Sequence, residues 1–138
     1  MKIRLLSDLH TELHPIVLNF KKHADVVILA GDIGNPYHDN YINLLNKLSL
    51  THEKVFVVSG NHEYYNNNIE ETDLYLSNLC EDNVHFLQKQ SIIYKNVKFI
   101  GCTLWSDPDQ SLCKYINDFA KIQNFTYDKY KSLHLNHK

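Results

Sequence analysis

The sequence contains no apolar run close to the roughly 20 residues that a helix needs to cross a bilayer. Its first residues, MKIRLLSDLH, reach Asp8 too early to hold the apolar core of a signal peptide. The three cysteines form no CxxC pair, and their odd number leaves a free thiol in any disulfide scheme. A formal charge of −2 provides no clustered basic face for long nucleic acid or an anionic membrane. These absences favour a cytoplasmic protein without a membrane partner.

Apolar segments of two kinds are present in the 138 residues, whose composition fits one globular domain over residues 1–138. Short, continuously apolar segments predict buried strands, whereas apolar residues three to four apart predict amphipathic helices. The strands are expected at 2–7, 25–32, 54–60, 84–88, 91–95 and 97–105, and the helices at 40–49 and 69–79. Residues 19–23 are expected to end a short helix or loop, and the polar, aromatic tail at 113–138 to be partly helical.

The order of these elements indicates the fold class. Strands that alternate with helices in the first half predict β-α-β units and therefore a parallel sheet. After residue 82 the strands follow one another directly, so the sheet either ends differently there or is followed by a second sheet. The expected class is α/β.

Polar side chains follow the first three predicted strands directly. They are Asp8 and His10 after the first strand, Asp32 after the second, and Asn61 and His62 after the third. In an open α/β sheet, ligands bind outside the carboxyl ends of the strands, so these side chains should meet in one crevice. Carboxylates mixed with imidazole suit Mn, Fe or Zn, whereas an all-oxygen set would suit Mg or Ca better.

Each of these side chains has an expected role and a structural alternative. Asp8 and His10, two apart in extended backbone, would point the same way and hold one cation. Asp32 could bridge two cations about 3.5–4 Å apart, or it could be a helix N-cap. Asn61 offers a neutral oxygen ligand, or a cap for the turn after its strand. His62 could donate a proton or hold a phosphoryl oxygen, or it could be an ordinary surface histidine.

Other residues near strand ends or in the tail have less specific interpretations. Tyr64 and Tyr65 could line a substrate pocket or pack against the core. Trp105 is expected to pack, and the role of Asp107 stays open. His134 and His137, three apart in the tail, could share a cation on a helix, but a frayed terminus is the better interpretation.

Three blocks of the sequence, SDLH, LAGDIGN and SGNHEYY, resemble the DxH, GDxxx and GNH[DE] motifs of the calcineurin-like metallophosphoesterases. The blocks IGCTLWSD, INDFAKIQ and YKSLHLNH resemble a bacterial-type subfamily with TLW(T/S)D and ND(F/Y)xxI motifs. The resemblance implies a metallophosphoesterase-like α/β/β/α sandwich, two metal ions, and hydrolysis of phosphomonoesters or phosphodiesters by metal-bound hydroxide. By position, it implies that Asp8 and His10 bind the first metal, Asp32 bridges both, Asn61 binds the second, and His62 is the acid or phosphate-stabilising residue.

The sequence departs from the family pattern in lacking a further metal-binding histidine and a GHxH block. The sandwich is therefore expected to be incomplete at its C-terminal side, and the site to hold one ion or two, with impaired activity. The expected substrate is a small phosphorylated molecule. The alternative function is that of a catalytically impaired, truncated homologue acting as a binding or assembly module, with a homo-oligomer covering the unfinished sheet.

Overall fold

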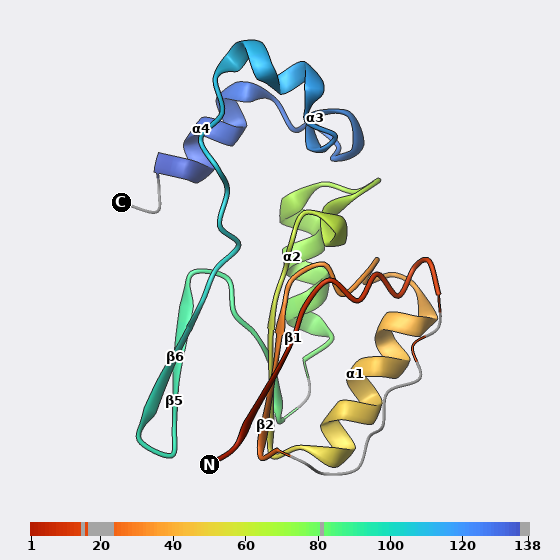
Figure 1. The fold of residues 1–138 in the computed structure, drawn as a ribbon, viewed down its shortest axis with the longest axis vertical. Coiled ribbons are helices and arrows are strands. Elements are labelled where there is room, and N and C mark those ends of the chain that lie inside the picture. Colours follow the sequence, from red (N-terminus) through yellow and green to blue (C-terminus); the bar gives the residue numbers. More distant parts are fainter. Residues whose placement is uncertain (15, 17–23, 81, 136–138) are drawn as a thin grey trace.

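A computed structural model describes residues 1–14, 16, 24–80 and 82–135 of the chain (Figure 1). The strands are β1 (Ile3–Leu6), β2 (Val26–Ala30), β3 (Lys54–Val58), β4 (Val84–Phe86), β5 (Gln90–Tyr94) and β6 (Val97–Gly101). The helices are α1 (Asp39–Thr51), α2 (Ile69–Asn78), α3 (Asp118–Lys121) and α4 (Tyr127–Leu135), with the short 3₁₀ helices η1 (His62–Tyr64) and η2 (Gln110–Tyr115). None of the helices in the described ranges is both long and apolar enough to cross a membrane.

The first four strands form one parallel sheet in the order β1-β2-β3-β4. Ile28 in the middle of β2 is paired with Leu5 of β1 and with Phe56 of β3. Strands β2 and β3 consist almost entirely of apolar residues, which suits strands that are covered on both faces. The predicted parallel sheet is therefore confirmed, and the carboxyl ends of its strands lie along one edge.

Helices α1 and α2 cover one face of this sheet (Figure 1). The buried residues of α1, at helical spacing, are Tyr41, Leu44, Leu45 and Leu48. They pack in one cluster with Val27 of β2, Val55 of β3 and Leu76 of α2. Helix α2 begins at an N-cap, since the side chain of Asn68 accepts a hydrogen bond from the N–H of Glu71 at 2.8 Å. Both helices predicted in this part of the sequence are present.

The antiparallel hairpin of β5 and β6 covers part of the opposite face. Phe99 of β6 packs over Phe56 of β3 with ring centroids 4.4 Å apart, next to Val26 and Leu87. A second, two-stranded sheet thus follows β4, which is one of the two outcomes left open by the sequence.

The sequence predicted that this strand would extend to Trp105, but β6 ends at Gly101. The cause is a set of side-chain hydrogen bonds that compete with strand pairing. The N–H of Thr103 donates to Oε1 of Gln88 at 3.1 Å, and its hydroxyl donates to the carbonyl of Ser59 at 2.8 Å. Residues 102–105 therefore run beside the end of β3 without extending the hairpin.

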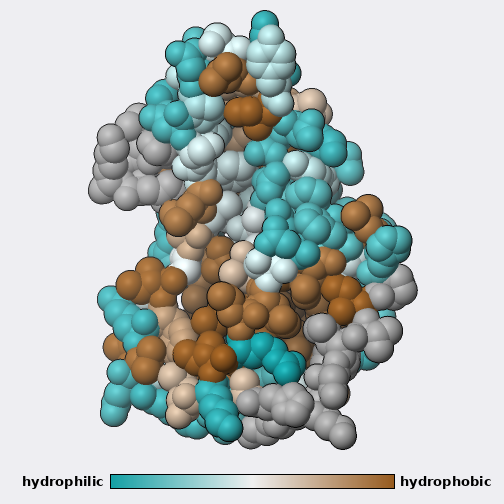
Figure 2. Space-filling view, in the orientation of Figure 1, coloured by the Kyte–Doolittle hydropathy of each residue, from teal (hydrophilic) through white to brown (hydrophobic). Residues whose placement is uncertain are grey.

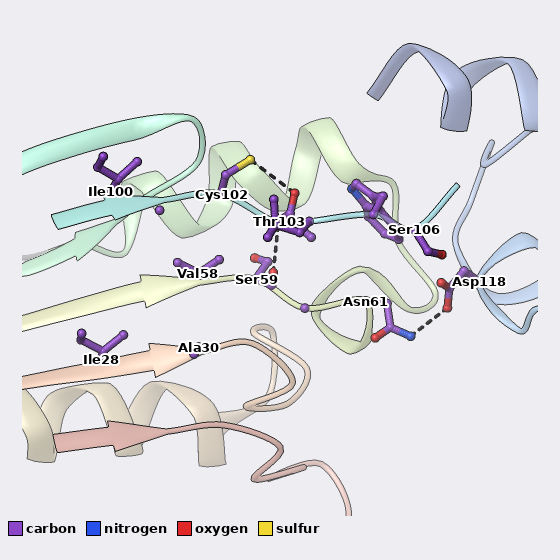
Figure 3. Close-up of a pocket in the computed structure, with 14 residues that line it drawn as sticks. Ile28, Ala30, Val58, Ser59, Asn61, Ile100, Cys102, Thr103, Ser106 and Asp118 are labelled. Atoms are coloured by element: carbon purple, nitrogen blue, oxygen red, sulfur yellow. Dashed lines mark hydrogen bonds between the residues drawn. The ribbon is translucent and has the colours of Figure 1, made fainter. Parts of the chain in front are cut away.

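The part of the same sheet face that belongs to β1 and β2 is left uncovered by the described residues (Figure 2). Leu5 is 65% exposed, and Leu104 on the facing segment is 82% exposed. A hollow of about 640 Å³ on this face is lined by Leu104 together with Ile28, Val58 and Ile100, and it reaches Asn61 (Figure 3). Contiguous exposed apolar surface of this kind is typical of an interaction site.

The C-terminal segments pack beyond the carboxyl ends of the strands, at the top of Figure 1. Trp105 packs among Tyr64, Phe125 and Tyr130, with centroid distances of 6.1, 5.1 and 6.3 Å, as expected for a packing residue. Asp107 forms an ion pair with Lys131 at 2.7 Å. The predictions for residues 19–23 and His137, and for the side chain of His134, lie outside the described residues.

Candidate metal centre

Three loops meet where β1, β2 and β3 end. The loop after β1 runs beside the loop after β2, because the N–H of Asp8 donates to the carbonyl of Gly31 (3.1 Å) and the N–H of His10 to that of Asp32 (3.0 Å). The loop after β3 joins them, since the N–H of His62 donates to Oδ1 of Asp32 at 3.0 Å. Side chains from three separate parts of the chain are thereby brought to one place.

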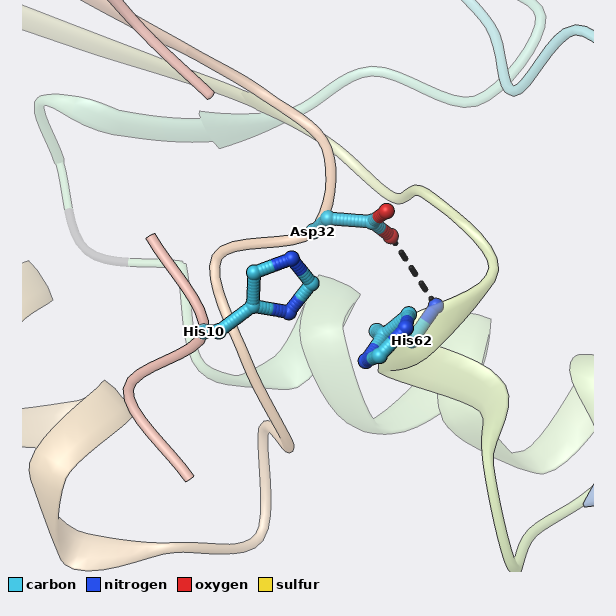
Figure 4. Close-up of side chains that lie close together, drawn as sticks. All are labelled: His10, Asp32 and His62. Carbon is cyan, nitrogen blue, oxygen red and sulfur yellow. Dashed lines mark hydrogen bonds between the residues drawn. The ribbon is translucent and has the colours of Figure 1, made fainter. Parts of the chain in front are cut away.

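His10, Asp32 and His62 form the closest group of side chains that could bind a metal ion (Figure 4). One ligand atom from each lies within 4.8 Å of the others, and all three side chains are partly buried. The two imidazole rings have centroids 4.4 Å apart and are inclined by 68°. In the described part of the chain, no second group of three His, Cys, Asp or Glu residues lies this close.

The backbone of this region is left-handed at Asp8, His10 and Asp32, with φ of 54°, 47° and 54°. The expectation that Asp8 and His10 project to one side from extended backbone is therefore wrong, because side chains alternate in this way only in a strand. Left-handed backbone costs a non-glycine residue about 1 kcal/mol or more, and it is found preferentially at functional sites.

Gly31 and Gly60 allow two of the loops to touch. Gly31 has a φ of +89°, and a Cβ at this position would lie 2.9 Å from the backbone nitrogen of Gly60. A Cβ on Gly60 would lie only 2.2 Å from Oδ1 of Asp32. Only glycine at position 60 therefore lets the third loop pass directly behind the Asp32 carboxylate.

Glu63 holds the loops together from the interior. Its carboxylate accepts hydrogen bonds from four backbone N–H groups, those of Asp32 (3.0 Å), Ile33 (2.7 Å), Gly34 (3.4 Å) and Gly60 (2.8 Å). The side chain is fully buried, and this burial raises the pKa of Glu63 to about 7, although the backbone donors act in the opposite direction. The Glu of the GNHE block thus has a positioning role that the sequence interpretation did not assign.

Glu12 lies behind both histidines and was also missed. Its Oε1 lies 3.1 Å from Nδ1 of His62 and 3.4 Å from Nδ1 of His10. Partial burial acts to raise the pKa of Glu12, but hydrogen bonds from its own backbone and from the two histidines outweigh burial and lower it. A carboxylate at Nδ1 favours the tautomer with a proton on that atom, so Nε2 of each ring is left for a metal or substrate.

The other two predicted ligands, Asn61 and Asp8, lie outside the group of three. The side-chain nitrogen of Asn61 donates to the hydroxyl of Tyr65 and to Oδ1 of Asp118, both at 2.8 Å. Burial, followed by the hydrogen bond to Asp118, raises the pKa of Tyr65 to about 12. The exposed carboxylate of Asp8 accepts a hydrogen bond from the hydroxyl of Ser7. For both residues, metal ligation stays a prediction.

The donor set fits a divalent transition metal. Imidazole nitrogen and carboxylate oxygen are ligands of Mn, Fe and Zn. Two ligands that each lie about 2.2 Å from an ion are at most roughly 4.4 Å apart, so ligand atoms of His10, Asp32 and His62 that lie within 4.8 Å of one another need only a small shift to reach a common ion. Glu12 supplies the outer carboxylate that commonly orients a metal-binding histidine, and its second oxygen is buried without a partner in the described residues.

The chain matches the calcineurin-like phosphoesterase family over residues 1–136. It therefore belongs to that family, as the motifs at the three strand ends predict, and the expected fold class is confirmed. The chain is also similar to the uncharacterized protein L509 of Acanthamoeba polyphaga mimivirus, with 35% identity over 150 residues. That match covers 92% of this chain and 54% of the relative, so the chain spans about half the length of the curated relative it matches.

Proposed function

We propose that this chain hydrolyses phosphomonoesters or phosphodiesters of small molecules with one or two divalent transition metals, manganese, iron or zinc. The observation that carries the proposal is the meeting of His10, Asp32 and His62 at the carboxyl edge of the sheet in a member of a phosphoesterase family. When bound, such a metal polarises phosphoryl oxygens and lowers the pKa of water to about 7, so that water can attack phosphorus at neutral pH. The free cysteines support a cytoplasmic location: Cys80, Cys102 and Cys113.

Each side chain of the site has a separate role in the proposed reaction. His10 and Asp32, with Asp8, hold the metal, and the peptide N–H of His62 keeps the Asp32 carboxylate in place. Asn61 presents its amide oxygen to a metal or its amide group to the phosphate. Because Nδ1 of His62 is already engaged by a carboxylate, its Nε2 is the atom that faces the substrate, where the doubly protonated ring donates a proton to the leaving oxygen or a hydrogen bond to a phosphoryl oxygen.

The test measures release of nitrophenol from a nitrophenyl phosphomonoester and from the corresponding diester, with and without Mn²⁺. We expect turnover that Mn²⁺ stimulates, and we expect His62→Asn to lower kcat by about 10²- to 10⁴-fold. The matched control is His38→Asn, at an exposed position before α1. If the wild-type chain shows no metal-stimulated turnover, or if His62→Asn is as active as the control, the proposal is wrong.

The uncovered face of β1 and β2 favours a second candidate function, that of an assembly module. Among the described residues β1 is an edge strand of the sheet, and Leu5 is 65% exposed on the open face. We propose a second copy of this chain as the occupant, because the edges of two β1 strands and two identical apolar faces are self-complementary about a twofold axis.

Light scattering after gel filtration tests the assembly. The wild-type chain should elute as a dimer, Leu5→Glu should be monomeric, and Leu50→Glu should remain dimeric, since Leu50 is 86% exposed on α1, away from this face. A monomeric wild-type chain at all concentrations up to the solubility limit would rule out the module. Its loss would leave the hydrolytic proposal untouched.

A further inference from the structure

The INDF block, Ile116–Phe119, has no part in the function proposed so far. Its acidic residue Asp118 begins α3 and lies beside the loop that carries Asn61 (Figure 3). The two segments are joined by an antiparallel bridge between Tyr65 and Ile122. Ile122 is only 3% exposed and belongs to the aromatic cluster above the site, so α3 is anchored in the folded chain. Asp118 is thereby held in a fixed place relative to the site.

Asp118, Asn61 and Tyr65 form a closed set of hydrogen bonds. Oδ1 of Asp118 accepts from Nδ2 of Asn61 at 2.8 Å and from the hydroxyl of Tyr65 at 3.0 Å. The same nitrogen of Asn61 also donates to the Tyr65 oxygen at 2.8 Å. A side-chain amide has two N–H donors, so both donors of Asn61 are used within this set.

This arrangement determines which way the amide of Asn61 points. An ionised carboxylate can only accept hydrogen bonds, so the reversed amide would place its oxygen against that of Asp118. The nitrogen must therefore face α3. Figure 3 shows the consequence: the nitrogen of Asn61 points toward Asp118 and its oxygen points the other way.

We propose that Asp118 is a positioning residue that acts through Asn61 and aims its amide oxygen at the metal centre. The inference rests on the part of the proposed function that makes Asn61 a metal ligand. The proposal gives the INDF block a role, because Asp118 at the start of α3 provides the carboxylate that accepts the hydrogen bond from Asn61. Tyr65 also holds the amide of Asn61 in this orientation, because its hydroxyl accepts a hydrogen bond from Asn61 and donates one to Asp118.

Calorimetric titration with Mn²⁺ alone tests the proposal without any substrate. Asn61→Ala first identifies the binding event that depends on Asn61. Asp118→Ala should weaken that same event by about 10- to 100-fold, the usual effect of losing a residue that orients a metal ligand. Asp118→Asn keeps an acceptor oxygen but loses the charge, so its loss should be intermediate. Asp128→Ala, at an exposed position in α4, is the matched control and should bind like the wild type.

A double substitution separates positioning from a general structural effect. In the Asn61→Ala background, Asp118→Ala should cause no further loss of Mn²⁺ affinity, because the residue through which it acts is already gone. Equal losses in both backgrounds would overturn the proposal. So would wild-type affinity in Asp118→Ala or in Asn61→Ala. If Asp118→Ala does not fold, the isosteric Asp118→Asn decides, and wild-type affinity in that variant overturns the proposal.

The hydrolytic function can fail independently. A chain that binds Mn²⁺ through Asn61 and Asp118 but releases no nitrophenol would refute hydrolysis and support the positioning role. A chain that hydrolyses the ester with His62 dependence, but whose Mn²⁺ affinity does not respond to Asp118, would give the opposite result.

Discussion

Replacement of Gly60 by alanine should damage metal binding in addition to destabilising the fold. The added Cβ would lie 2.2 Å from Oδ1 of Asp32 and 2.7 Å from its backbone nitrogen, and an ordinary contact begins near 3.4 Å, so the carboxylate oxygen has to retreat by about 1 Å and the loop behind it has to shift as well. A metal site tolerates deviations of only about 0.2 Å in its ligand distances. The carboxylate is not free to rotate away, because Oδ1 also accepts the N–H of His62 at 3.0 Å.

We therefore expect Gly60→Ala to weaken Mn²⁺ binding at least tenfold, roughly the lower limit seen when ligand orientation is disturbed. Overpacking of this size should lower the free energy of unfolding of the metal-free chain by about 1–3 kcal/mol. Gly101→Ala is the matched control, because its Cβ would lie 2.4 Å from Cβ of Leu87 and 2.9 Å from Cγ2 of Val58, which are not metal ligands.

Two measurements on both variants separate the effects. Urea unfolding in EDTA reports the overpacking, and it should show both proteins destabilised. Calorimetric titration with Mn²⁺ reports the ligand, and it should show a loss for Gly60→Ala alone. Wild-type affinity in Gly60→Ala would refute the reasoning, as would an equal loss of affinity in Gly101→Ala.

Three further outcomes are expected. Glu63→Ala leaves four N–H groups, two of them buried and two partly buried, without their acceptor, and it should lower the free energy of unfolding in urea by about 3 kcal/mol. The exposed Glu71→Ala should lower it by less than about 1 kcal/mol, and equal midpoints would contradict the positioning role. Glu12→Gln should weaken Mn²⁺ binding in calorimetry by about 10- to 100-fold, because its oxygen faces both histidines, and unchanged affinity would exclude that role. Mn²⁺ at about 100 times its Kd should raise the free energy of unfolding of the wild-type chain by about 2.7 kcal/mol, reversibly with EDTA. Asp32→Ala should show no such rise, and an equal rise would remove Asp32 from the site.

Most of the sheet and its two covering helices could be predicted from local pattern. β2 and β3 are continuous apolar segments, and α1 repeats its apolar residues at helical spacing, so each carries its own signal. The end of β6 could not be predicted. It depends on hydrogen bonds from Thr103 to Gln88 and Ser59, which are 15 and 44 residues away in the sequence.

The site shows the same division between local and distant information. His10, Asp32 and His62 each follow a strand, so the topology of the sheet is enough to predict that they meet. Glu12 and Asp118 follow no such rule, because Glu12 joins His10 to His62, which lies 50 residues away from Glu12, and Asp118 acts on a partner 57 residues away. The left-handed turns at Asp8 and His10 were hidden as well, since either residue type also fits extended backbone.

Asp8, His10 and Asp32 have left-handed backbone, so the side chains that they bring to the site come at a cost in folding stability. Glycine at Asp8, His10 or Asp32 would relieve roughly 1 kcal/mol of steric cost, a noticeable share of the about 5–15 kcal/mol that stabilise a typical domain. Glycine substitutions at these positions would therefore stabilise the chain and at the same time remove the side chains that face the crevice.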